Sequence, residues 1–155
     1  MAQPYSLYRR QWLPIPLEEA FAFFERPENL ARITPPWLGF QMRTAEPVAM
    51  AEGVFLDYTI RVLGLPVRWR SRILEYDPPH GFRDAQVVGP YRRWDHRHRF
   101  WAEAGGTVVE DRVEYALPFG IFGRGAHWLF VGRQLAAIFD YRQRRIEELL
   151  VQPAA

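Results

Sequence analysis

The 155-residue sequence contains no cysteine and no lysine. Without cysteine there are no disulfides, no thiolate nucleophile and no thiolate-bound zinc or iron–sulfur centre. Without lysine, neither a Schiff base nor the lysine of a phosphate-binding loop is available. All 20 basic residues are arginines, which do not serve as proton-transfer bases. Several large classes of enzyme are thereby excluded, and no serine elbow or glycine-rich phosphate loop replaces them.

Long apolar runs are also missing. No stretch approaches the roughly 18 apolar residues that a membrane span needs, and the chain does not open on a basic segment followed by an apolar run. We therefore expect a cytoplasmic protein without membrane insertion. The formal net charge is only +2, with 18 acidic residues mixed among the arginines. We accordingly expect no nucleic-acid partner. We also expect no cofactor.

Aromatic residues, in contrast, are plentiful: they make up 15% of the chain and include six tryptophans. The sequence has no internal repeat and no flexible linker, so we expect residues 1–155 to form a single ligand-binding domain. A domain of this size buries about 68–70% of the surface of its unfolded chain. The aromatic content exceeds what a minimal core requires, and some of it is expected to line a ligand site.

The apolar spacing predicts an α+β fold. Residues 5–13 read as a strand, and two short helices follow, the second at residues 27–33. From residue 40 to 117 the period changes to two, which predicts six more strands in an antiparallel meander. After a connection at residues 118–125, a long helix reaches about Leu150. A curved seven-stranded antiparallel sheet is thus expected to wrap around a long C-terminal helix, with the short helices closing one end.

Strand alternation places several polar side chains on the inner face of this sheet. In residues 91–102, His96 and His98 share the face opposite to the arginines, and neighbouring strands present Asp84 and Asp111 on the same side. An unpaired buried polar group costs about 1–3 kcal/mol, so we expect the two carboxylates to meet the imidazoles or ordered water. The predicted inner face carries Tyr58, Trp69, Ser71, Asp84, Gln86, Trp94, His96, His98 and Asp111.

Four interpretations of the histidines and carboxylates stay open. They form a structural network that sets strand register, or the polar end of an apolar pocket. They act as general acid and base, with His96, His98, Asp84 and Asp111 as the candidate catalytic residues. They bind zinc or iron, although neighbouring side chains on one face of a strand lie some 6–7 Å apart. We expect no metal.

The glycine-rich connection at residues 118–125 carries exposed apolar candidates. Phe119, Ile121 and Phe122, opposite Trp37 and Leu38, either form the mouth of a pocket or complete the core. We include Phe122 among the ligand-binding residues. The apolar start of the long helix, with Trp128, Leu129 and Phe130, is a candidate contact for a homodimer.

The arginines are expected on the outer surface. Arg68, Arg70 and Arg72 alternate on one strand, and Arg97 and Arg99 should pair with Glu110 and Glu114 across two strands. The last turns of the long helix carry further arginines, expected to be solvated, because cations suit a helix C-terminus. These are Arg142, Arg144 and Arg145.

Three segments resemble a bacterial branch of the START-like superfamily, also called SRPBCC, which includes polyketide cyclase/dehydrase-like proteins. They are residues 28–37 (ENLARITPPW), 89–100 (GPYRRWDHRHRF) and 111–120 (DRVEYALPFG). The resemblance implies the helix-grip fold over nearly the whole chain. It also implies binding of a small hydrophobic molecule such as a lipid, isoprenoid, quinone or aromatic polyketide. One fold hosts many chemistries, so a cyclase, aromatase or dehydratase and a protein-interaction module stay as alternatives.

Overall fold

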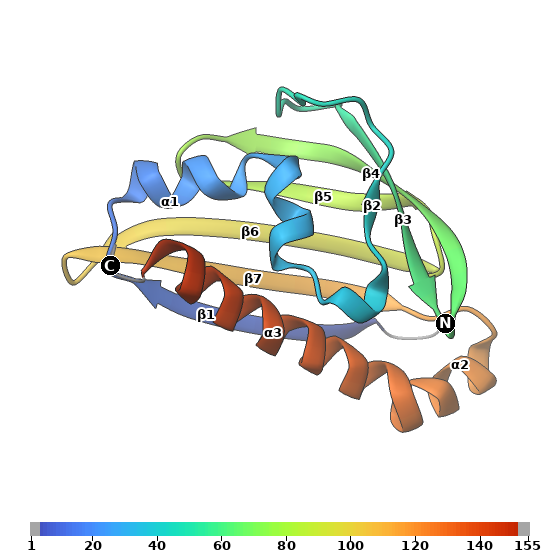
Figure 1. Ribbon diagram of the computed structural model, residues 1–155. Helices are drawn as coiled ribbons and strands as arrows, with labels where there is room; N and C mark the ends of the chain where they lie inside the picture. The colour runs from blue at the N-terminus through green and yellow to red at the C-terminus, as the bar shows by residue number, and fades with distance from the viewer. Residues whose placement is uncertain (1–3, 152–155) are drawn as a thin grey trace.

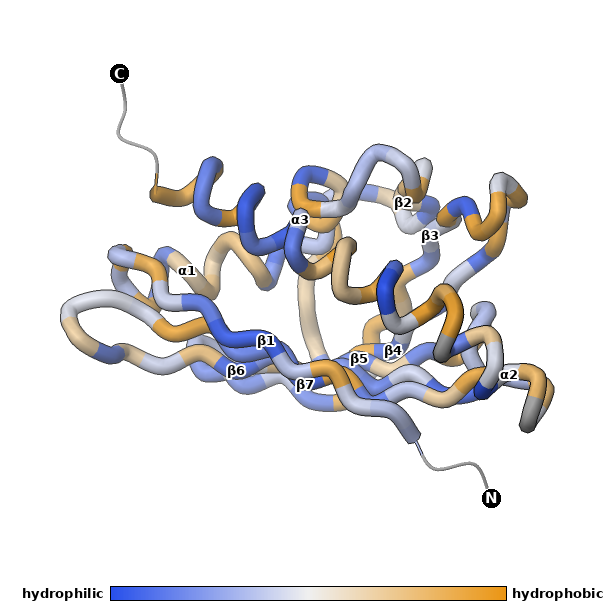
Figure 2. Tube along the Cα trace, turned by 90° about the horizontal axis from the view of Figure 1, so that it is seen from below, coloured by the Kyte–Doolittle hydropathy of each residue, from blue (hydrophilic) through white to orange (hydrophobic). Residues whose placement is uncertain are grey.

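The computed structural model describes residues 4–151, apart from the side chains of Ile121 and Trp128. Its sheet is antiparallel, with seven strands in the order β1-β7-β6-β5-β4-β3-β2 (Figure 1). The strands are β1 (Tyr5–Leu13), β2 (Gln41–Met42), β3 (Phe55–Val62), β4 (Leu65–Asp77), β5 (Gly81–Val88), β6 (Arg93–Glu103) and β7 (Gly106–Ala116). A long helix crosses one face of the sheet (Figure 2). The predicted α+β helix-grip fold is confirmed.

Short helices follow β1, as the sequence predicts. They are α1 (Leu17–Phe24) and the 3-10 helices η1 (Pro27–Ile33) and η2 (Pro36–Leu38). Proline at position 16 precedes α1, and the acidic Glu18 and Glu19 in its first turn suit the helix dipole. The helix buries Phe21, whose ring meets that of Phe100 edge-on at 5.3 Å. This contact holds α1 against β6 at one end of the sheet.

Strand β4 shows the alternation most clearly. Trp69, Ser71 and Ile73 are buried, whereas the three arginines between and before them are exposed. A bulge interrupts the pairing of β4 with β5 between Ile73 and Glu75. Extra residues of this kind bend a strand and increase its twist, which helps the sheet to curve around the helix.

The final helical segment begins earlier than predicted. Residues 118–125 were expected to be a connection, but α2 (Gly120–Ala126) is already helical and continues through one π-helical turn, η3 (His127–Val131), into α3 (Gly132–Leu150). Phe119 caps α2 with φ of 70°, and a Cβ atom on Gly123 would lie 2.2 Å from the Pro118 carbonyl oxygen. The absence of a side chain at Gly123 therefore permits the close helical start here.

The start of this helix was also expected to cover the sheet or meet a partner. In the structure α2 extends beyond the end of the sheet (Figure 1), and the side chains of Leu129 and Phe130 are 52% and 65% exposed. The α3 part packs on the sheet through Leu135, Phe139 and Ile146. The π-helical turn before it contacts the sheet through His127, whose ring stacks on Tyr5 at 3.5 Å and whose Nε2 lies 2.7 Å from the Tyr115 hydroxyl. Among the described residues, no helix is both long and apolar enough to cross a membrane.

Buried apolar residues form two clusters. One surrounds α1 and the end of α3 and includes Phe21, Phe82, Phe100 and Ile146. The other includes Trp69, Trp94, Val113, Leu135 and Phe139. The site described next lies between them.

Candidate functional site

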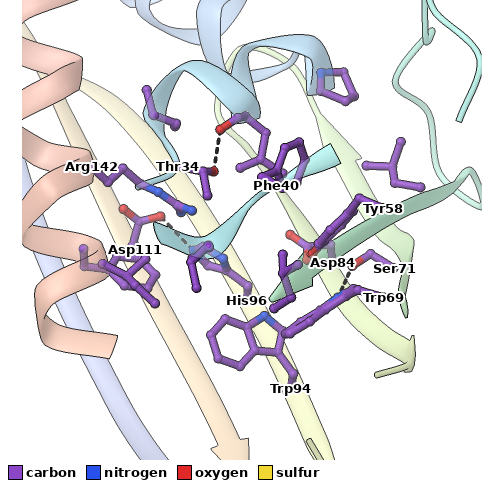
Figure 3. Close-up of a pocket in the computed structure, with 18 of the residues that line it drawn as sticks. Thr34, Phe40, Tyr58, Trp69, Ser71, Asp84, Trp94, His96, Asp111 and Arg142 are labelled. Carbon is purple, nitrogen blue, oxygen red and sulfur yellow. Dashed lines mark hydrogen bonds and ion pairs between the residues drawn. The ribbon is translucent and has the colours of Figure 1, made fainter. Parts of the chain in front are cut away.

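A cavity of about 330 Å³ lies between the concave face of the sheet and α3 (Figure 3). Its volume is at the lower end of the range of small-molecule sites. Apolar side chains from β3, β4, β6, the short helices and α3 form most of its wall, and polar side chains form the remainder. Eight predicted site residues line it: Tyr58, Trp69, Ser71, Asp84, Trp94, His96, His98 and Asp111.

Two histidines and two carboxylates form a compact group, here called the His–Asp cluster (Asp84, His96, His98 and Asp111). His96 Nε2 lies 2.8 Å from Asp111 Oδ1, and His98 Nε2 lies 3.0 Å from Asp84 Oδ2. The other ring nitrogen of His98, Nδ1, lies 3.2 Å from Asp111 Oδ1. The expected contact between carboxylates and imidazoles is therefore present.

Strand register explains why these four side chains meet. His96 and His98 stand two residues apart on β6, so both project to the same face, and their rings stack with centroids 3.7 Å apart. Asp84 is opposite His96 on β5, and Asp111 is opposite His98 on β7. Each carboxylate thus approaches from a different neighbouring strand.

Protonation in the cluster follows from its contacts. Both ring nitrogens of His98 face carboxylate oxygens, so both can donate a hydrogen bond when both carry protons. Burial alone would lower the pKa of His98, but the hydrogen bonds to Asp111 and Asp84 outweigh it and raise this pKa. Burial and the neighbouring His98 lower the pKa of His96. Burial opposes ionisation of Asp111, yet its bonds to both imidazoles hold its pKa far below the ordinary range.

The cluster connects the two apolar clusters of the core. The His98 ring stacks on Phe82 at 4.1 Å, and the His96 ring meets Phe139 at 5.8 Å. Because its hydrogen bonds lie among apolar rings rather than in water, they are stronger than surface bonds.

Aromatic side chains build the neighbouring wall of the cavity. Tyr58 stacks on Trp69 at 5.7 Å, and Trp69 meets Trp94 edge-on at 5.3 Å. The indole of Trp69 donates a hydrogen bond to Ser71 Oγ at 3.0 Å. Burial raises the pKa of Tyr58, so its hydroxyl stays protonated at neutral pH. Flat aromatic surfaces with few polar groups suit an apolar molecule.

Two residues predicted at the site do not line the cavity. The Gln86 side chain binds its own turn: its Nε2 donates to the Tyr91 carbonyl at 2.7 Å, and its Oε1 accepts from the Tyr91 amide at 3.1 Å. The prediction that Gln86 points inward rested on the alternation of β5 alone. It did not consider that the following turn would use the side-chain amide as a hydrogen-bond partner. Phe122 is 82% exposed on α2, because the helix continues past the sheet.

The predicted pocket mouth is therefore not assembled as expected. Phe119 is 82% exposed like Phe122, and Trp37 packs edge-on against Tyr141 at 5.8 Å. Leu38 does line the cavity. The side chains of Ile121 and Trp128, named for the mouth and for a dimer contact, lie outside the described part of the structure.

A cavity-lining residue that sequence reasoning misplaced is Arg142. It was assigned to the solvated end of the helix, but its side chain lines the cavity from α3. A signal was available in the helical period: Arg142 follows Leu135 and Phe139 and precedes Ile146 on the buried stripe of α3. An arginine at such a position is rarely a surface residue.

A metal would have Asp84, His96 and His98 as its ligands, since one donor atom of each lies within 4.8 Å of the others. The present arrangement suits hydrogen bonds better. The two rings are stacked rather than converging, and both nitrogens of His98 already face carboxylates.

Ion pairs on the outer face engage several arginines. Arg97 pairs with Glu75 at 3.0 Å and Arg93 with Glu114 at 3.3 Å. Glu110, expected as a partner of arginine, instead accepts a hydrogen bond from the Tyr8 hydroxyl at 2.8 Å. The partner of Arg97 thus comes from β4, because the strand register aligns Glu75, Arg83 and Arg97 across β4, β5 and β6.

The fold and the cavity together define a START-like protein, in which a curved sheet and one long helix enclose a site for a hydrophobic ligand. Comparison with models of protein families identifies the family to which the chain belongs. The model described as "Polyketide cyclase / dehydrase and lipid transport" matches residues 13–139, and the chain belongs to this family. The resemblance noted in the sequence is confirmed. A comparison with curated proteins gave no match.

Solved structures show the same fold at low sequence identity. TTHA0849 from Thermus thermophilus is 20% identical with a TM-score of 0.66, over 94% of this chain and 99% of that one. Protein Ms6760 from Mycobacterium smegmatis is 15% identical with a TM-score of 0.67, over 94% and 90%. Ginseng major latex-like protein 151 from Panax ginseng is 12% identical with a TM-score of 0.70, over 97% and 100%. These similarities establish fold.

Proposed function

We propose that the protein binds a small, largely apolar molecule in the cavity between the sheet and α3, without catalysing its conversion. A lipid, isoprenoid, quinone or aromatic polyketide fits this description. The observation that carries the proposal is the cavity itself, a space of about 330 Å³ lined mostly by aromatic and aliphatic side chains. Membership of a family described by polyketide cyclases and lipid transport supports the same class of ligand.

Filling the cavity tests this proposal. Ile60 on β3 lines the cavity and is half-buried, so Ile60→Trp would occupy ligand space. The matched control is Leu65→Trp, because Leu65 lies on the neighbouring strand and is 68% exposed. We expect the neutral dye aminoanthracene to bind wild type and Leu65→Trp equally, and Ile60→Trp at least about tenfold more weakly, which corresponds to about 1.4 kcal/mol.

Urea unfolding of each variant separates loss of binding from loss of fold. A second variant, Ile138→Trp, fills the same cavity from α3. Undiminished dye binding by both folded filling variants would show that the dye site lies elsewhere and would contradict the proposal.

Acid–base catalysis is a second candidate function, favoured by His98 at the cavity wall, whose two ring nitrogens both face carboxylates. Its raised pKa makes it a proton donor near neutral pH, as a cyclisation or dehydration of a carbonyl compound requires. Incubation with small polyketide-like diketones tests it, with His98→Asn as the comparison. A product formed by wild type and lost in a folded His98→Asn variant would support catalysis, whereas release of every compound unchanged would count against it.

A further inference from the structure

The guanidinium of Arg142 is a charged group inside a mostly apolar cavity. Its side chain projects from α3 toward the space beside Thr34 and Asp111 (Figure 3). Its Nε atom is buried and has no hydrogen-bond partner within the described residues. Its central carbon lies 4.8 Å from the ring centre of Phe139, which gives a cation–π contact but accepts no hydrogen bond.

The neighbouring carboxylates do not use this cation as their partner. Asp111 Oδ1 is within hydrogen-bond distance of both His96 and His98, and Asp84 faces His98. No ion pair joins Arg142 to an acidic side chain of the described residues, although Asp111 lies close enough to raise the pKa of Arg142 electrostatically. Burial lowers the pKa of Arg142, but arginine keeps its proton in proteins, so the charge remains.

A charge balance shows what this position lacks. Asp84 and Asp111 as carboxylates, with a doubly protonated His98 and a neutral His96, carry one net negative charge, which Arg142 offsets at a distance. Its buried Nε–H group nevertheless still lacks an acceptor. A buried donor without an acceptor is destabilising, and more so when it is charged. An anionic group in direct contact with the guanidinium would supply this acceptor through a charge-assisted hydrogen bond.

We propose that Arg142 holds the carboxylate of an amphipathic ligand whose apolar part occupies the cavity. This inference rests on the proposed function and narrows it to acids. The planar fork of an arginine matches the two oxygens of a carboxylate and binds them through parallel hydrogen bonds. The aliphatic and aromatic wall then surrounds the remainder of the molecule. A ligand without an anionic head leaves the guanidinium unsatisfied.

Decanoate and methyl decanoate provide the test, because they share one chain and differ in the charged head. Displacement of aminoanthracene from wild type, at neutral pH and below the critical micelle concentration of the acid, is expected to show at least about tenfold tighter binding of the acid. In Arg142→Met this preference should disappear, while the ester binds as in wild type. Arg142→Lys should retain part of the preference, since it keeps a cation without the fork.

Arg144→Met is the matched control, because Arg144 lies on the same helix and is exposed. It should keep the full preference for the acid. Urea unfolding of Arg142→Met without ligand shows that the variant is folded, and some loss of stability is expected, because Arg142 offsets the net negative charge of the His–Asp cluster. If Arg142→Met does not fold, Arg142→Gln replaces it.

The outcomes separate the two proposals. Equal binding of acid and ester by wild type, or a preference that survives in Arg142→Met, overturns the role of Arg142 and leaves the apolar site intact. Failure of the dye, the acid and the ester to bind wild type overturns the proposed function, and the inference with it.

Discussion

Replacing Asp111 with asparagine removes the charge that two histidines share. Asp111 Oδ1 lies 2.8 Å from His96 Nε2 and 3.2 Å from His98 Nδ1, and its side chain is only 12% exposed. Asparagine keeps the shape and one acceptor oxygen, so the substitution tests the charge rather than the packing. It leaves His98 with a single carboxylate partner, Asp84.

The magnitude follows from the burial of the pair. Removing one member of a buried ion pair costs about 3–5 kcal/mol, and a hydrogen bond to a charged group contributes about 1.5–3 kcal/mol. Because asparagine retains part of the hydrogen bonding, we expect Asp111→Asn to lower the free energy of unfolding by about 3 kcal/mol. With a denaturant slope of about 1–3 kcal/mol/M, the urea midpoint should fall by about 1–3 M.

The effect should depend on pH in a defined direction. His98 has a raised pKa, so its contribution is complete below its unfolded pKa of about 6.5 and is lost as pH rises through the folded value. Asp111 has a lowered pKa, so its contribution is present above about pH 3.9 and is lost on strong acidification. The difference between wild type and Asp111→Asn should therefore be largest between about pH 4 and 6.5 and smaller in alkali.

Urea unfolding followed by tryptophan fluorescence across this pH range is the assay. Glu103→Gln is the control, because Glu103 pairs with Arg10 at 2.7 Å while both side chains are nearly half exposed. Such a surface pair contributes at most about 1 kcal/mol. A loss below about 1 kcal/mol in Asp111→Asn at every pH would refute the assignment of a shared, buried charge.

Three further predictions concern other parts of the molecule. Gly123→Ala should destabilise the fold by about 1–3 kcal/mol, because the new Cβ would lie 2.2 Å from a carbonyl oxygen. In the control Gly125→Ala the new Cβ has open space, so this variant should gain up to about 1 kcal/mol of stability. Equal urea midpoints of the two variants would contradict this difference. Elemental analysis of dialysed protein should find far less than one metal ion per chain, and a stoichiometric ion that disappears in His96→Asn would reverse our interpretation of the His–Asp cluster. The exposed apolar start of the last helix predicts concentration-dependent association in analytical ultracentrifugation. Phe130→Ser should weaken this association, and the control Val87→Ser, at an exposed residue of β5, should not. An unchanged sedimentation coefficient at every concentration would count against a homodimer there.

Much of the sheet and of the His–Asp cluster was predictable from the sequence. The side chains of a strand alternate with a period of two, so the inward direction of His96 and His98 follows from the charged Asp95, Arg97 and Arg99 that alternate with them. The same reasoning placed Trp69 and Ser71 inside β4, and the structure buries both. The need of buried carboxylates for partners then predicted contacts that the register of three neighbouring strands provides.

Departures from prediction occurred where an element meets its surroundings. Gln86 has the correct parity for an inward side chain, but the turn after β5 uses its amide. Phe122 is apolar, yet α2 extends beyond the sheet that would have buried it. The periodicity of a strand shows which face a side chain points to. It does not show whether a neighbouring turn binds that side chain, or how far a helix extends beyond the sheet.

The sequence by itself determined the order of the elements, the inner face of each central strand and the absence of thiol and lysine chemistry, because these depend on local spacing and composition. The helical period puts Arg142 on the apolar stripe of the long helix, but only the tertiary structure decided which part of that stripe faces the cavity, since the position of a helix over a sheet depends on packing along its whole length. That packing turns Arg142 inward beside Asp111 and exposes Phe130. The polar end of the site thus combines a cluster that strand pairing makes predictable with a cation that helix packing alone brings to it.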